Sequence, residues 1–133
     1  MAQPYSLPVL TLPGLRANST GLATSQFLVG KLASTAGQVI LNGTSAFAGN
    51  LVGIIMNKPG PNEEVEFLVS GVGKLVVSTS TIVPGDVVGC NTTSKGTDGS
   101  TTDNGSRLGK ALQASAAAND IISVLLIPGG WRY

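Results

Sequence analysis

The sequence contains no histidine and only one cysteine in 133 residues. Without histidine, a zinc site or a Ser-His-Asp triad would have to be built without its usual parts. The single Cys90 cannot form a disulfide within the chain, and it follows the run Asp-Val-Val-Gly at 86–89, so we expect it to be a small core residue. These shortages argue against the commonest catalytic centres, and we expect no metal, no cofactor and no enzymatic activity.

Charged residues are also scarce: they make up 11% of the chain, whereas ordinary soluble domains have roughly a quarter. The formal net charge is +1, and a low net charge promotes association. We therefore expect a protein that works within an assembly, the alternative being a monomer with a Ser/Thr surface. Because the basic residues are scattered and aromatic residues make up only 5%, the sequence predicts no nucleic-acid partner.

Long apolar runs are missing as well. No run has the length of a transmembrane helix, so we expect no membrane partner. The amino terminus is interrupted by Pro4, Pro8 and Pro13 and has no basic start, which is unlike a secretory signal.

Residues 1–22 differ from the rest of the chain. Their prolines favour extended backbone, both at the prolines and at the residues before them. The segment is too apolar for a disordered tail left in water, since it contains Leu7, Val9, Leu10, Leu12 and Leu15. We expect an extended N-terminal arm whose apolar side chains lie on the chain's own barrel or on a neighbouring subunit.

Residues 23–133 alternate between turn signals and short β-rich runs, with no long amphipathic helix. This pattern predicts an all-β domain, a small β-barrel or sandwich of about seven or eight short strands. We expect strands within residues 26–33, 37–43, 50–57, 64–71, 74–82, 86–91, 108–113 and 121–127, and a turn at 115–120.

Two turns and one alternating strand carry the most specific signals. Asn42-Gly43 suits a type I′ hairpin turn, and Val83-Pro84-Gly85-Asp86 has proline and glycine where a tight turn needs them. Strict alternation in residues 64–71 predicts two different strand faces. One face would carry Val65, Phe67 and Val69, and the other Glu64, Glu66 and Leu68.

The segment 91–106 contains no large apolar residue. We expect a long polar loop in which Lys95, Asp98 and Asp103 are exposed to solvent. The order of its acidic residues does not match a calcium-binding loop.

The other concentration of carboxylates is at Glu63, Glu64 and Glu66. Glu64 and Glu66 would project from one strand face about 7 Å apart, which leaves a glycoside hydrolase open as an alternative. No aromatic platform for a sugar accompanies them, so we favour a solvated strand face.

Four segments, taken in order, resemble the small capsid decoration (head cement) proteins of tailed bacteriophages. These are a strand ending in Asn at 53–57, the strand 63–71, a turn of the form I-x-x-G-D-x-V at 82–88, and an ending at 109–125 that reads G-x-A-L-x-A…D-I-I-x-V-L. The resemblance covers residues 50–127, and its motifs are turn and core residues, none of them catalytic.

The resemblance implies a structural virion protein that binds the outer surface of an icosahedral phage head and stabilises it. Its partner would be the major capsid protein, and it would act as a homotrimer over threefold positions. We expect the arm to contact neighbouring capsid subunits and the 91–106 loop to face away from the shell. The alternative is a carbohydrate-binding or adhesive β module on a virion surface, which would use the polar loop and Trp131.

Overall fold

The computed structural model describes residues 9–10, 14–41, 51–98 and 107–127, and this part of the chain contains eleven strands and no helix. Three strands have two residues, and the other eight have three to six, so the expected all-β fold of short strands is confirmed. Within these ranges, no helix could cross a membrane. The strands are β1 (Val9–Leu10), β2 (Arg16–Ala17), β3 (Val29–Leu32), β4 (Gln38–Leu41), β5 (Leu51–Ile55), β6 (Phe67–Leu68), β7 (Gly71–Val76), β8 (Val87–Cys90), β9 (Gly96–Asp98), β10 (Arg107–Ala111) and β11 (Ile121–Leu126).

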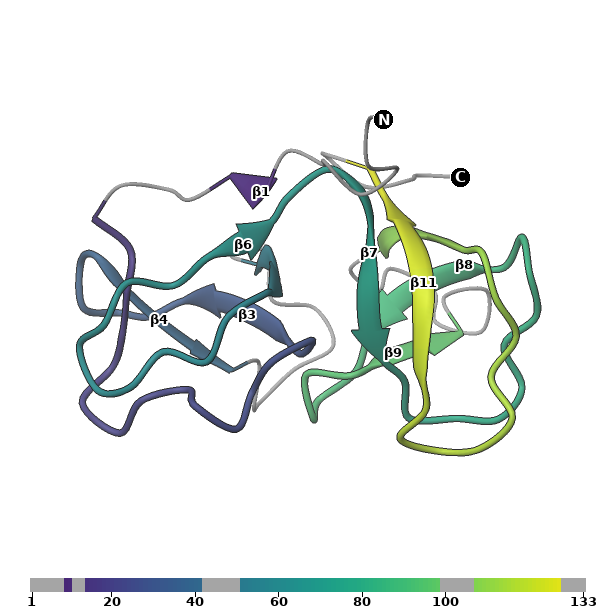
Figure 1. Cartoon of the computed structure of the whole chain (residues 1–133), viewed down its shortest axis with the longest axis horizontal. Helices are drawn as coiled ribbons and strands as arrows, with labels where there is room; N and C mark the ends of the chain where they lie inside the picture. The colour runs from purple at the N-terminus through teal and green to yellow at the C-terminus, as the bar shows by residue number, and fades with distance from the viewer. Residues whose placement is uncertain (1–8, 11–13, 42–50, 99–106, 128–133) are drawn as a thin grey trace, which may run out of the picture.

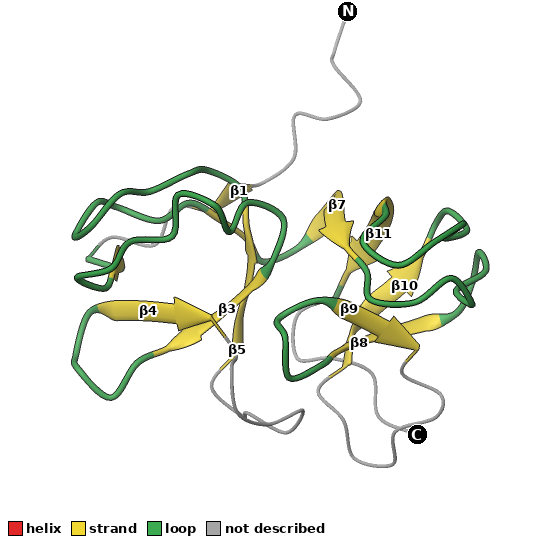
Figure 2. Cartoon of the chain, turned by 90° about the horizontal axis from the view of Figure 1, so that it is seen from below, coloured by secondary structure: helices red, strands yellow, loops and turns green. Residues whose placement is uncertain are grey.

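The strands form two sheets that use successive halves of the chain. Sheet A contains β1 to β6 in the order β1-β6-β5-β3-β4-β2, and sheet B contains β7 to β11 in the order β7-β11-β10-β8-β9. In Figure 1, sheet A lies on the left and sheet B on the right, and Figure 2 shows the same two groups from below. The chain passes from one to the other between β6 and β7, through Val69 and Ser70.

Each sheet curls until its ends approach each other. In sheet A, Arg16 of β2 pairs with Glu64, and the amide of Ala17 donates to the Glu63 carbonyl at 2.8 Å, so the edge strand meets the segment that leads into β6. In sheet B, Val77 after β7 pairs with Gly96 of β9. The expected small barrel is therefore present as two curled sheets placed side by side.

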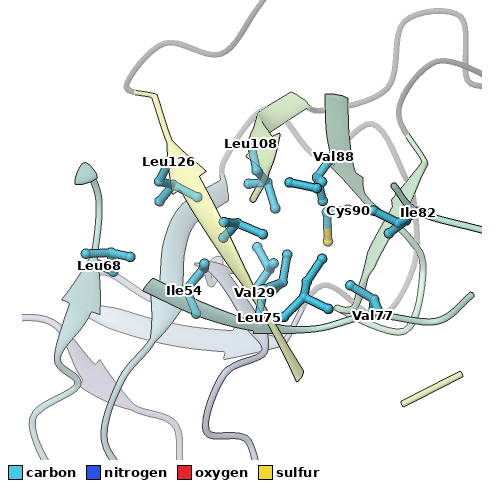
Figure 3. Close-up of a cluster of buried hydrophobic side chains, with 13 residues drawn as sticks. Val29, Ile54, Leu68, Leu75, Val77, Ile82, Val88, Cys90, Leu108 and Leu126 are labelled. Atoms are coloured by element: carbon cyan, nitrogen blue, oxygen red, sulfur yellow. The ribbon is translucent and has the colours of Figure 1, made fainter. Parts of the chain in front are cut away.

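Two hydrophobic clusters follow from this arrangement. The smaller lies within sheet A and contains Ala17, Leu22, Val39, Ile55, Val65 and Phe67. The larger fills sheet B and also includes Val29, Ile54 and Leu68 from sheet A (Figure 3). The neighbouring residues Phe67 and Leu68 thus point into different clusters, and both are fully buried. This confirms the two-faced alternation expected for residues 64–71.

The predicted turn before β8 is also present. Gly85 has φ +95°, the Asp86 amide donates to the Val83 carbonyl at 3.1 Å, and the Val83 amide donates to Asp86 Oδ2 at 2.9 Å. Asn42 and Gly43 lie outside the described residues. The strand before them, β4, pairs with β3 and β2 rather than with β5, which follows them.

The carboxyl-terminal part forms the strand-turn-strand unit expected from the sequence. Strand β10 pairs with β11, and the turn between them is fastened by Asp120 Oδ2, which accepts from the amides of Ala116 and Ala117 at 2.7 and 3.1 Å. The register between β10 and β8 shifts between Arg107 and Gly109. Because of this irregularity, Leu108 can join the same buried cluster as Ala111.

Candidate functional site

The amino-terminal arm enters the structure as an edge strand. Val9 pairs with Leu68 and Leu10 with Phe67, which places β1 beside β6 at the end of sheet A. Among the described strands, β1 pairs with β6 alone. An edge strand of this kind presents one row of backbone groups to a further segment of chain. Leu7 and Leu12, which also belong to the expected contact set of the arm, lie outside the described residues.

The later part of the arm is built into sheet A. The Arg16 amide donates to the Gly37 carbonyl at 2.9 Å, and the Leu22 amide donates to the Pro59 carbonyl at 2.8 Å. Ala17 and Leu22 are buried in the smaller cluster, and Leu15 packs against it. From Gly14 onward, therefore, these side chains have neighbours within their own chain, the first of the two possibilities left open by the sequence.

The carboxylates at 63–66 lie on an exposed loop. Glu63 Oε2 accepts from the Gly60 amide at 2.8 Å, which closes the turn. Asn57 then ties the loop to the end of β5: its Nδ2 donates to the Glu64 carbonyl, and its Oδ1 accepts from the Glu66 amide, both at 3.0 Å. The loop is thus held by backbone and amide contacts, while all three glutamate side chains are exposed. No group of three metal-ligating side chains occurs within the described ranges.

The polar segment after β8 is more ordered than the sequence indicates. Asn91 Oδ1 accepts from the amides of Thr93 and Lys95 at 2.9 and 3.0 Å, and residues 96–98 pair with β8 as strand β9. Lys95 and Asp98 are half-buried, and Lys95 Nζ donates to Asn119 Oδ1 at 2.6 Å. Asp103 lies outside the described residues. Sequence reasoning missed β9 because glycine and aspartate are rare in strands.

Cys90 is buried in the larger cluster, as expected (Figure 3). Its thiol Sγ donates to the Asn91 carbonyl at 3.3 Å. The residue therefore contributes packing volume to the core of sheet B. Trp131, the residue on which an adhesive site would depend, lies outside the described residues.

The fold is similar to that of a bacteriophage head fiber protein. The solved structure titled the head fiber gp8.5 N base in bacteriophage phi29 matches with a TM-score of 0.61 and 9% sequence identity, over 90% of this chain and 95% of that one. At this identity the likeness concerns the fold alone. No curated protein matches the chain by sequence.

The family is shown by the sequence itself. The model of the family described as phage cement protein matches residues 23–126, well over half of the chain. The chain belongs to this family of phage structural proteins, and the resemblance carried by its turn and core motifs is confirmed. It is thus a structural protein of a phage.

Proposed function

We propose that the chain binds the outer surface of an icosahedral phage head as a trimer and stabilises the shell, with the major capsid protein as its partner. The observation that carries the proposal is the match to the cement family over residues 23–126, which contain strands β3 to β11 of the two sheets. The scarcity of charge supports it, because a surface with 11% charged residues and a net charge of +1 is suited to contact.

The arm is the segment that we assign to the shell. Strand β1 lies at the edge of sheet A, where it pairs antiparallel with β6. An edge strand can extend a sheet by pairing with another chain, with side chains adding specificity. Leu7, Val9, Leu10 and Leu12 are the contacts proposed for the shell, whereas Leu15 anchors the arm to its own sheet.

Stabilisation would follow from mass action. A protein that binds only the mature shell stabilises it by RT ln(1 + [L]/Kd), about 2.7 kcal/mol per site at a hundredfold excess over Kd. The same contact repeats at every equivalent position of the shell. Modest binding at each site therefore adds up to a large effect on the whole head.

The test is co-sedimentation with heads of the corresponding phage assembled without the chain. The informative variant lacks residues 2–8 only, because a longer deletion would remove β1, and one that reached Ala17 would remove part of the core of sheet A. We expect the full chain to pellet with heads and the truncated chain to bind at least tenfold more weakly with an unchanged melting temperature. Equal binding by both would exclude residues 2–8, Leu7 among them, as a shell contact, and no binding by either would contradict the function.

A further inference from the structure

Exposed apolar side chains gather on sheet B. Of the four large apolar side chains that are exposed in the described part of the chain, three belong to this sheet and its loops: Val83 at 53%, Ile121 at 51% and Leu112 at 44% exposure. Leu112 and Ile121 lie on the outward side of the sheet, because the residue before Leu112 and the residue after Ile121 point into the core. Val76, which pairs with Ile121, is half-buried on the same side. In antiparallel sheets this outward side is usually polar.

The loop that contains Val83 lies beside the end of β10. The Gly85 amide donates to the Ala111 carbonyl at 2.8 Å, and the Ser115 amide donates to the Ile82 carbonyl at 3.0 Å. In Figure 1 this loop, which leads from β7 to β8, and the loop from β10 to β11 lie together at the lower right. The exposed Val83 is therefore close to the residues that follow β10.

Leu112 connects this loop region with β11. Its amide donates to the Ser123 carbonyl at 2.9 Å, so Leu112 lies diagonally across from Ile121, at a spacing that long side chains can bridge. We call the following set the end patch: Val76, Val83, Leu112 and Ile121.

Charged residues are missing around the end patch. None occurs in residues 75–85 or in residues 111–119. The exposed polar residues of these segments include Ser80, Thr81 and Gln113, which are neutral. An apolar centre without charge, inside a polar rim, is the arrangement found in protein interfaces.

The charges at the border of the end patch balance. Asp86 and Asp120 accept hydrogen bonds from backbone amides of their own turns. Lys74 and Lys95 donate to the neutral side-chain oxygens of Ser123 and Asn119. Two acids and two lysines leave no net charge, so this border neither attracts nor repels a charged partner.

A surface of this composition is complementary to itself. Apolar contact has no preferred direction, and hydroxyl and amide groups both donate and accept hydrogen bonds. No cluster of like charges would meet when two copies of the end patch approach each other, whereas such a cluster would repel its copy. A second copy of the same surface therefore satisfies every group that the end patch presents.

We infer that the end patches of neighbouring copies of this chain pack against one another. The inference rests on the proposed function, since it assigns the contact that holds the proposed trimer together around its symmetry axis. The contact leaves the arm free for the shell. Val9 of β1 pairs with Leu68 just before β7 begins, whereas Ile121 pairs with Val76 where β7 ends, about 20 Å away by strand geometry.

Serine variants test the contact. Leu112→Ser with Ile121→Ser removes two apolar side chains from the end patch and should lower the trimer fraction by at least about tenfold. Light scattering should then report one chain of 13.4 kDa instead of three. Leu32→Ser is the matched control, because Leu32 is 42% exposed but lies on β3 of sheet A. Equal effects of the two changes would overturn the inference, as would a wild-type chain that is monomeric at every concentration.

Thiol reactivity provides a test that does not remove the contact. Cys90 is buried, so a cysteine introduced at position 121 or 32 is the thiol that a maleimide reaches. Ile121→Cys should react at least about tenfold more slowly at concentrations where the trimer forms than after dilution, because the contact removes position 121 from water. Leu32→Cys should react at the same rate at both concentrations. A trimer in which position 121 stays fully reactive would contradict the inference.

Salt dependence separates an apolar contact from a charged one. Raising sodium chloride to about 1 M shortens the Debye length to about 3 Å. The trimer fraction should change by less than about twofold, since the end patch contains no charge. A trimer that dissociates at high salt would be held by charges elsewhere, and the inference would fail.

Head binding separates this inference from the proposed function. If the double serine variant keeps the trimer but no longer co-sediments with heads, the end patch binds the shell, and the inference fails while the function stands. If the trimer depends on the end patch but neither the variant nor the wild-type chain binds heads, the function fails while the contact between copies stands.

Discussion

Leu68 occupies the space that a side chain on Gly73 would need: a β-carbon at position 73 would overlap Leu68 Cδ2. Leu68 is fully buried at the end of sheet A, and Gly73 lies in β7, the first strand of sheet B. The pair therefore sets how closely the two sheets approach each other immediately after the chain passes between them.

Gly73→Ala should lower the free energy of unfolding by about 1–3 kcal/mol, because overpacking forces neighbouring atoms to move. Leu68→Ala should cost about 2–5 kcal/mol by leaving a cavity. The double variant should lose less than the sum of the two, since each change relieves the other. Denaturant unfolding measures all three, with Thr92→Ala, at an exposed position, as the control. Strict additivity would contradict the proposed fit.

Asn57 makes a second testable contribution, through both ends of its side-chain amide. Asn57→Ala removes the bonds to the Glu64 carbonyl and the Glu66 amide and should cost about 1–2 kcal/mol. Asn57→Asp keeps an acceptor for the Glu66 amide and should cost less than the alanine variant when charge is screened by salt. Thermal melting at high salt compares the two, and an equal loss would show that the acceptor contributes nothing.

Ser94 combines two unfavourable features. It is 1% exposed with φ +66°, and its Oγ has no hydrogen-bond partner in the described part of the molecule. Ser94→Gly removes both the buried hydroxyl and the β-carbon, so it should raise the free energy of unfolding by about 1 kcal/mol. The matched Thr93→Gly should lower it, because the Thr93 hydroxyl donates to Asn91 Oδ1 at 2.8 Å. A destabilised Ser94→Gly chain would mean that the hydroxyl has a stabilising role.

Local signals in the sequence were sufficient for the fold class and most strands. Alternation in residues 64–71 gave the two faces of β6, and the Pro-Gly-Asp pattern gave the turn that Asp86 Oδ2 closes. The family motifs have the same physical basis. Asn57 and Asp86, two of the polar residues in the resemblance, each bind backbone groups through the side chain, Asn57 in the loop at 64–66 and Asp86 in the turn at 83–86.

Long-range pairing was less accessible from the sequence. Strand β2 has only two residues and pairs in parallel with β4, and the paired residues are more than twenty positions apart in the sequence. No local pattern predicts such a strand. The division into two curled sheets likewise depends on which strands pair with each other, and local sequence patterns do not determine that pairing. The pairing of Ile121, Ser123 and Leu125 with Val76, Lys74 and Val72 on β7 also depends on the register of two strands far apart in the sequence.

Stabilisation of the shell has its own signature. The stabilisation depends on the ratio of the free concentration of the chain to Kd. The temperature at which heads open should therefore rise with the concentration of added chain, and above Kd it should rise only with the logarithm of that concentration. Light scattering during a thermal ramp measures this. The truncated chain lacking residues 2–8 should require at least tenfold higher concentration for the same shift. A constant opening temperature at all concentrations would show that binding does not stabilise the shell.

The most direct measurement is an electron cryo-microscopy reconstruction of heads assembled without the chain and then mixed with it. The account predicts new density on the outer surface at threefold positions, in which three copies of the two-sheet unit fit. Density on the inner surface, or heads unchanged at saturating concentrations of folded chain, would contradict it.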